Sequence, residues 1–327
     1  MSMKTMFINT GVGAVYTALN TALTSVSKKI ESTIFSEKDD VAAMLFSISS
    51  KIPITNNIKD LKYIDGKAFK MLDLIVHGTE YNSGKGIDDI NETLRIISES
   101  MPNIIVWTTD VSITKSKEKE ALTNYMGALA SLGYATNYRI INAFQYGSAH
   151  HFTQLYVIST KQTVDSQNFF EFPAPTASSG FKKVLPEYLE DEPSTEFDID
   201  YKHFALVLDE DVDQRHIIIR DEGRTNGEVL ALPGDAVRWD LPTEKQTKRV
   251  KQRAVPHLTS KPRHGVFWKS RYRFFTPFEY FKLQEFSTKD IQSICGLSIS
   301  NEKLYELAVT RSVNIRPATI ILYALLK

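Results

Sequence analysis

Apolar runs alternate with helical patterns through the first 160 residues. Short apolar runs, of the kind that form buried strands, are followed by longer stretches in which apolar residues recur every three or four positions. The strand-like runs are residues 4–8, 32–36, 72–76, 104–107, 138–142 and 154–159. The helical stretches are residues 15–26, 41–49, 90–98 and 118–132. Strands that alternate with helices predict an α/β fold, in which a Rossmann-like, mostly parallel sheet carries helices on both faces.

The pattern changes from about residue 170. Short strand-like runs at residues 204–208, 216–220 and 228–232 are separated by turn signals such as Asn226-Gly227. Helical patterns return from Thr276-Pro277 onward. We therefore divide the chain into three parts. These are a large domain over residues 1–170, a smaller irregular and β-rich region over residues 171–270, and a C-terminal segment over residues 271–327.

The composition excludes several classes of protein. The chain has 327 residues, of which 42% are hydrophobic and 24% charged, as in globular proteins. Its one cysteine, Cys295, excludes a disulfide framework and a multi-cysteine zinc site, and it is the only candidate thiol nucleophile. Residues 5–27 carry no charge, but frequent Thr, Asn and Ser, together with Gly11 and Gly13, argue against a membrane span or signal peptide. We expect a soluble, cytoplasmic protein without a membrane partner.

The zero net charge hides two separated blocks. Residues 187–213 hold eleven acids and one lysine, whereas residues 245–273 hold ten basic residues and no acid. Basic residues interleaved with aromatics suit a phosphate backbone and stacked bases, although a solvated face that balances the acidic block is an alternative. The candidate DNA-binding residues are Lys245, Lys248, Arg249, Lys251, Arg253, Lys261, Arg263, Lys269, Arg271 and Arg273.

Short motifs along the chain follow the order found in one enzyme family. In chain order they are Asp73-Leu74-Ile75-Val76 with Gly78, residues 91–97, Leu132-Gly133-Tyr134, Asn142-Ala143, Tyr146-Gly147, Leu155-Tyr156-Val157-Ile158, Arg273, Thr276-Pro277, Glu279, Leu283-Gln284 and Phe286. The ordered set resembles the cytosine-C5 DNA methyltransferases over roughly residues 5–160 and 271–325. The resemblance implies that the C-terminal segment returns to the large domain, and that residues 171–270 are similar to a target-recognition region.

The catalytic residues of that family are replaced in this sequence. Its members use a Pro-Cys thiolate to attack C6 of a flipped cytosine, but the aligned position here is Tyr81. A phenol with a pKa of about 10 cannot replace a thiolate in this step. The family's catalytic glutamate aligns with Thr109, and its Arg-x-Arg motif with Phe152-Thr153-Gln154. We therefore expect a pseudoenzyme without catalytic residues.

The glycine turn that makes room for S-adenosylmethionine in the family has an altered form here. Phe7 is followed by Gly11 and Gly13, and Glu37 follows a predicted strand where an acid would hold ribose hydroxyls. The family's late Gly-Asn pair aligns with Thr310-Arg311. A tight strand–helix turn without a ligand also explains the glycines. The cofactor is therefore either absent or S-adenosylmethionine.

Other reactive side chains have ordinary interpretations. Cys295 is interpreted as a small buried residue, and His77 as a loop residue close to the aligned catalytic loop. His150 and His151 are adjacent, so in an extended segment they point to different sides, and we expect no metal site.

Three functions remain open. The chain could be a catalytically inactive methyltransferase homologue that binds duplex DNA through its basic stretch. It could instead be a regulatory or scaffold subunit that pairs with an active methyltransferase or another protein. The third is an S-adenosylmethionine-dependent, nucleic-acid-modifying enzyme that uses other residues, such as Tyr81, His77, Asp110 or Glu80.

Overall fold

The chain forms two compact units, each assembled from separate stretches of sequence. The structure, a computed structural model, describes residues 2–79, 86–115, 119–163, 169–176, 185–198, 204–207, 217–221, 228–231, 236–238, 255, 257–261, 264–269 and 271–327. Unit 1 comprises Met1–Asn142, Thr153–Pro175 and Thr310–Lys327, and unit 2 comprises Ala143–Phe152 and Thr176–Val309. The division differs from the one expected at residues 170 and 270, because residues 271–309 belong to unit 2 and the chain returns to unit 1 only at Thr310.

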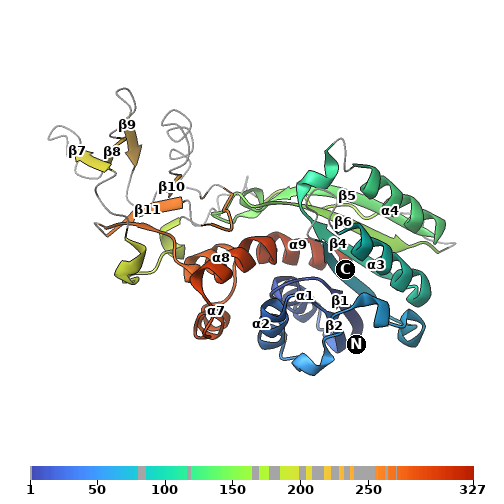
Figure 1. Cartoon of the computed structure of the whole chain (residues 1–327). Coiled ribbons are helices and arrows are strands. Elements are labelled where there is room, and N and C mark those ends of the chain that lie inside the picture. The colour runs from blue at the N-terminus through green and yellow to red at the C-terminus, as the bar shows by residue number, and fades with distance from the viewer. Residues whose placement is uncertain are drawn as a thin grey trace. The chain divides into compact units, whose positions relative to one another are not determined.

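A six-stranded sheet forms the centre of unit 1 (Figure 1). Its strands, in spatial order, are β2 (Lys29–Ser36), β1 (Ser2–Ile8), β3 (Leu74–Thr79), β4 (Ile104–Thr109), β6 (Thr153–Lys161) and β5 (Tyr134–Asn142). The first four are parallel to one another, while β6 is antiparallel to both β4 and β5. The expectation of a Rossmann-like, mostly parallel sheet is therefore confirmed.

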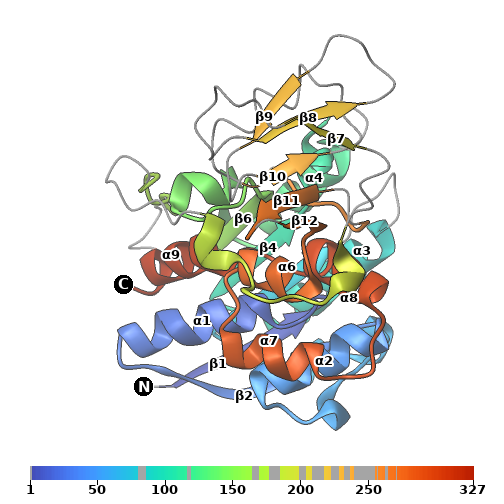
Figure 2. The same ribbon diagram turned by 90° about the vertical axis from the view of Figure 1, so that its left-hand side faces the viewer.

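Helices cover both faces of this sheet because its central strands, such as β1, place apolar residues on both sides. They are α1 (Ala14–Ser25), α2 (Asp40–Ser50), α3 (Ile87–Ser100), α4 (Lys119–Ser131) and α9 (Ile315–Leu326), with 3-10 turns η1 (Ile54–Asn56), η2 (Leu61–Tyr63), η3 (Gly66–Phe69) and η4 (Val111–Thr114). On β1, Met6 and Ile8 belong to the core that buries residues of α3 and α4. Phe7, between them, packs its ring against Tyr16 of α1 and Phe46 of α2. Figures 1 and 2 show α9 alongside α1.

Unit 2 combines small antiparallel sheets with short helices (Figure 2). One sheet holds β7 (Phe204–Val207), β8 (Ile217–Asp221) and β9 (Glu228–Ala231), and the other β10 (Ala236–Arg238), β11 (His264–Trp268) and β12 (Arg271–Phe274). The helical elements are η5 (Ala143–Tyr146), η7 (Leu185–Tyr188), η8 (Thr195–Phe197), α6 (Pro277–Leu283), α7 (Thr288–Cys295) and α8 (Asn301–Thr310). A capping box between Thr276 and Glu279 starts α6. In the described part of the chain, no helix has the length and apolar character needed to cross a bilayer.

The turn between β1 and α1 contacts the backbone of the segment that precedes the C-terminal helix, α9. Gly11 and Gly13 both have positive φ, at 71° and 93°. The N–H of Val12 donates to the carbonyl oxygen of Arg311 at 2.9 Å. A Cβ on Gly11 would lie only 1.8 Å from that oxygen, and a Cβ on Gly13 would lie 2.9 Å from Cβ of Ser49. The two glycines are therefore required for the close approach of other parts of unit 1.

We expect Gly11→Ala to destabilise the protein by about 3 kcal/mol or more, since the methyl group displaces the residue 311 backbone and the left-handed φ strains alanine. Urea unfolding followed by circular dichroism measures the change. The matched control is Gly127→Ala in α4, where an added Cβ meets nothing within 4 Å; it should leave stability unchanged or raise it by up to about 1 kcal/mol. Equal stabilities for Gly11→Ala and the wild type would contradict this account of the turn.

Candidate functional site

Four residues expected at a cofactor site come together in unit 1. Gly11 and Gly13 form the turn after β1, and Phe7, fully buried, lies in the strand that leads to it. The Phe7 ring is 5.6 Å from the rings of Tyr16 and Phe46, so it belongs to an aromatic cluster beneath the turn. Glu37 follows β2 and reaches Gly11.

The carboxylate of Glu37 is buried and held by backbone donors. Only 1% of the residue is exposed. Its Oε2 accepts the N–H of Gly11 at 2.9 Å, and its Oε1 accepts the N–H of Asp39 at 3.2 Å. Burial raises the pKa of this carboxyl group, while the positive charge of Arg311 and the two backbone hydrogen bonds oppose the rise.

Two further residues complete this site, and sequence analysis assigned neither of them to it. Asn57 holds the backbone of Glu37 from both sides: its Oδ1 accepts the Glu37 N–H at 2.8 Å and its Nδ2 donates to the Glu37 carbonyl at 3.0 Å. Arg311 places Nη1 3.7 Å from Oε1 of Glu37. The replacement of the family's Gly-Asn pair by Thr310-Arg311 was the available signal for Arg311, but it does not show where the guanidinium goes.

The positions that align with catalytic residues carry other chemistry. Tyr81 and Glu80 lie outside the described residues. Thr109 ends β4 and is buried, at 3% exposure, so a hydroxyl and not a carboxylate occupies that strand end. Asp110 is exposed and accepts the N–H of Ser112 at 2.7 Å as the cap of η4.

The aligned Arg-x-Arg positions also have structural roles. In unit 1, Gln154 of β6 donates to the carbonyl of Ser312 at 3.1 Å. In unit 2, the ring of Phe152 stacks on His257 with 5.2 Å between ring centroids.

His77 is a core residue of β3, so the expectation that it lies in a loop was wrong. It is fully buried and its Nε2 lies 2.6 Å from the hydroxyl of Tyr125. Its ring stacks on Trp107 at 5.4 Å. Burial lowers the pKa of His77 to about 3, so the imidazole is neutral at physiological pH.

The single thiol of the chain is not activated. Cys295 ends α7 in unit 2 and is only partly buried, so its interpretation as a buried residue was wrong. Burial, reinforced by the negative charge of Glu190, raises the pKa of Cys295 to about 11. A neutral thiol at physiological pH is a poor nucleophile.

The adjacent histidines contribute to packing in unit 2. His150 is fully buried and its Nε2 accepts the N–H of Leu258 at 3.2 Å. The His151 ring stacks on Phe144 at 4.2 Å. Among the residues that the structure describes, no group of three His, Cys, Asp or Glu side chains could hold a metal ion.

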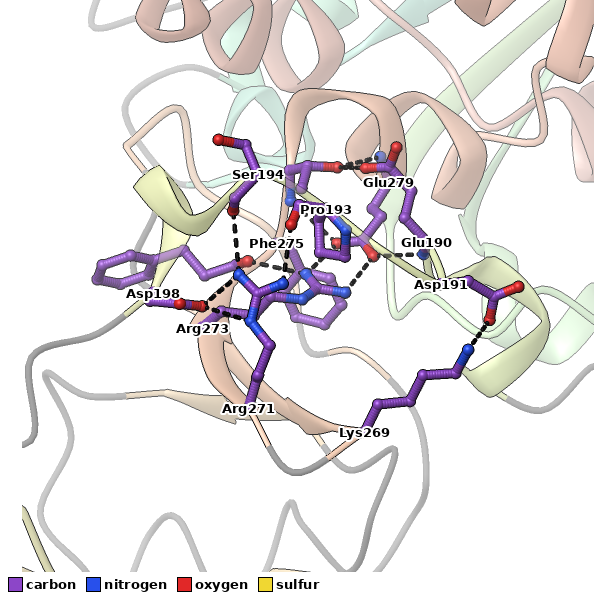
Figure 3. A network of polar contacts seen from close by, with 12 residues as sticks. Glu190, Asp191, Pro193, Ser194, Asp198, Lys269, Arg271, Arg273, Phe275 and Glu279 are labelled. Carbon is purple, nitrogen blue, oxygen red and sulfur yellow. Dashed lines mark hydrogen bonds and ion pairs between the residues drawn. The ribbon is translucent and has the colours of Figure 1, made fainter.

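The C-terminal end of the basic stretch pairs with acids inside unit 2 (Figure 3). Nζ of Lys269 lies 2.7 Å from Oδ1 of Asp191, and this cation lowers the pKa of the Asp191 carboxyl group. Arg271 lies 2.7 Å from Asp198 and also donates to the carbonyls of Pro193 and Ser194.

Arg273 is paired more deeply than the other two. Its Nη2 lies 2.7 Å from Oε1 of Glu279 and its Nη1 lies 2.8 Å from Oε2. Arg273 is 1% exposed and Glu279 is fully buried. Glu279 also accepts the N–H of Glu190 at 2.8 Å. A guanidinium in this position cannot reach a phosphate, so Arg273 is removed from the set of candidate DNA-binding residues.

Lys261 is described and exposed. The remaining basic candidates lie outside the described residues: Lys245, Lys248, Arg249, Lys251, Arg253 and Arg263.

Comparison with known proteins gives a consistent result over nearly the whole chain. A family model described as C-5 cytosine-specific DNA methylase matches residues 3–294. A putative DNA modification methyltransferase from an Escherichia coli prophage superposes with a TM-score of 0.68 at 13% identity, covering 99% of this chain and 98% of that one. The Schizosaccharomyces pombe Dnmt2 methyltransferase gives 0.64 at 13% identity over 97% and 96%. The Entamoeba histolytica methyltransferase EhMeth gives 0.62 at 15% identity over 100% and 99%. No curated protein sequence matches the chain significantly.

The low pKa of His77 makes stability depend on pH. The folded protein keeps His77 neutral down to about pH 3, whereas the unfolded chain takes up a proton below about 6.5. The contribution of neutral His77 to the free energy of unfolding is therefore fully present above pH 6.5, and it is lost as the pH falls toward 3. Between pH 7 and pH 4, we expect the free energy of unfolding of the wild type to fall by about 3 kcal/mol more than that of a His77→Phe/Tyr125→Phe variant.

Urea unfolding at pH 7, 5 and 4 measures this difference. Tyr125→Phe alone is the control, because it removes the hydroxyl and keeps the titrating imidazole. It should retain the steep pH dependence. An identical dependence in the wild type and in the variant without His77 would refute the assignment.

Proposed function

The chain belongs to the C-5 cytosine-specific DNA methylase family, and we propose that it is a catalytically inactive member that binds duplex DNA. One observation carries the first half of this proposal. Methylation at C5 in this family starts with a thiolate, and the only thiol of this chain is Cys295, which is neutral and lies in α7 of unit 2.

The other candidate catalytic groups give no support to an altered enzyme. His77 is enclosed in the core of unit 1 with a strongly lowered pKa, so it is a poor general base at neutral pH. Asp110 caps η4, and Thr109 offers no carboxylate to the base ring. Of the residues named as examples for an altered enzyme, Tyr81 and Glu80 therefore remain.

DNA binding is supported by family membership and by the charge of the region before β11. Because Arg273 is buried and Lys269 and Arg271 are paired, the proposed interface consists of the basic residues preceding them. They are Lys245, Lys248, Arg249, Lys251, Arg253, Lys261 and Arg263. Seven cations within residues 245–263, a stretch that contains no acid, suit contacts to phosphates, which provide affinity with little sequence specificity.

No covalent adduct should form with a duplex that contains 5-fluorocytosine, because the chain has no thiolate to attack C6. The protein is incubated with the duplex and S-adenosylmethionine and analysed on a denaturing gel. Cys295→Ala is run in parallel and should give the same result. An adduct that forms with both proteins would show a nucleophile other than Cys295 and would overturn the assignment of inactivity.

Neutralising part of the basic stretch should weaken duplex binding and its dependence on salt. We expect Lys245→Gln/Lys248→Gln/Arg249→Gln to lower the slope of log K against log salt by about 2 to 3, since each phosphate contact contributes about 0.9. Fluorescence anisotropy between 50 and 200 mM salt, roughly, measures this slope.

The matched control replaces three exposed lysines of unit 1, Lys62→Gln/Lys67→Gln/Lys70→Gln, which changes the net charge by the same amount. It should retain the wild-type slope. Equal losses in both variants would show a nonspecific charge effect, and undetectable binding by the wild type would sink the DNA-binding half of the proposal.

A further inference from the structure

Glu37, which would hold the ribose of a cofactor, is already engaged by the chain itself. The family uses S-adenosylmethionine, and the place of Glu37 after β2 is where an acid binds ribose hydroxyls. Here both oxygens accept backbone N–H groups, the residue is 1% exposed, and the guanidinium of Arg311 stands 3.7 Å away. We propose that Arg311 takes the place of the cofactor at Glu37 and that this chain binds no S-adenosylmethionine.

The glycine turn supports the same conclusion. In cofactor sites of this type, the turn after the first strand offers backbone N–H groups and open space to the ligand. In this chain the N–H of Gly11 donates to Glu37 and the N–H of Val12 donates to the carbonyl of Arg311. The space next to Gly11 is filled by that same carbonyl. Two donors of the turn and the space beside it are therefore used within unit 1.

Electrostatics explains why an arginine suits this position. A buried carboxylate without a counter-charge is costly, and its pKa rises until it takes up a proton. Burial does raise the pKa of Glu37, and Arg311 is the largest influence that opposes the rise. The side chain of Arg311 is 21% exposed, so the cation keeps partial contact with water while it stabilises the buried acid.

The proposal goes beyond inactivity and DNA binding, since it concerns a small molecule and an ion pair within unit 1. Isothermal titration calorimetry tests it with S-adenosylmethionine and S-adenosylhomocysteine at up to about millimolar concentration. The wild type should show no binding. Arg311→Asn, which restores the family's residue and removes the guanidinium, should bind with a Kd at least tenfold below the highest ligand concentration tested.

Two control variants separate this effect from a general loss of charge. Arg311→Lys keeps a cation near Glu37 and should remain without binding. Arg139→Asn removes another arginine of unit 1, one that lies over the Phe172 ring, and should behave as the wild type. Micromolar binding by the wild type, or a folded Arg311→Asn that binds no better than the wild type, would overturn the proposal.

A double-mutant cycle keeps the test decisive if Arg311→Asn does not fold. The cycle compares Glu37→Gln, Arg311→Met and the double variant by urea unfolding. Glu37→Gln keeps an oxygen acceptor for Gly11 but removes the charge and the acceptor for the N–H of Asp39, and the cycle cancels this common effect. Pairing between the two residues should appear as a coupling of about tenfold in the unfolding equilibrium constant. Additive effects would show that the two side chains do not interact and would overturn the proposal, whatever the outcome of the duplex-binding assay.

Discussion

The contact between the Arg311 carbonyl and the Gly11 turn is the constraint on which the rest of unit 1 depends. It joins the loop after β1 to the segment that leads into α9, and so places α9 alongside α1. The same contact brings the guanidinium of Arg311 to the end of β2, next to the buried carboxyl group of Glu37. One backbone approach, possible only at a glycine, therefore sets both the packing of a helix and the chemistry of the strand ends.

The sheet of unit 1 could be predicted from sequence because its central strands, such as β1 and β4, are buried on both faces and appear as apolar runs. The C-terminal end of β3 could not be predicted in this way. His77 and Gly78 end the apolar run after residue 76, but β3 continues to Thr79 because β1 pairs with it as far as His77 and β4 as far as Thr79. The buried imidazole is accommodated by the hydroxyl of Tyr125, 48 residues away in the chain. Because Tyr125 is so distant in the sequence, no local pattern around His77 indicates this contact.

Capping signals likewise predicted only local structure, such as the start of a helix. The Thr276-Pro277 and Glu279 pattern predicts the start of α6 correctly, since all its hydrogen bonds lie within one turn. It does not show that the Glu279 carboxylate also binds Arg273 and the backbone of Glu190. Those contacts place α6 in unit 2. The separation of the acidic and basic blocks is visible in the sequence, but the ion pair between Arg271 and Asp198 could not be predicted from it.

The division of unit 1 into three stretches has a consequence for synthesis and folding. Residues 11 and 311 are in contact but are separated by roughly 300 positions, so the ribosome completes the stretches of unit 2 before it supplies α9. During that time β1 and α1 lack the helix that covers them. Closing such a long loop is slow, because its entropy must be lost before any contact forms. The β1–α1 part of unit 1 is thus made well before α9, but it reaches its final packing only after α9 has been made.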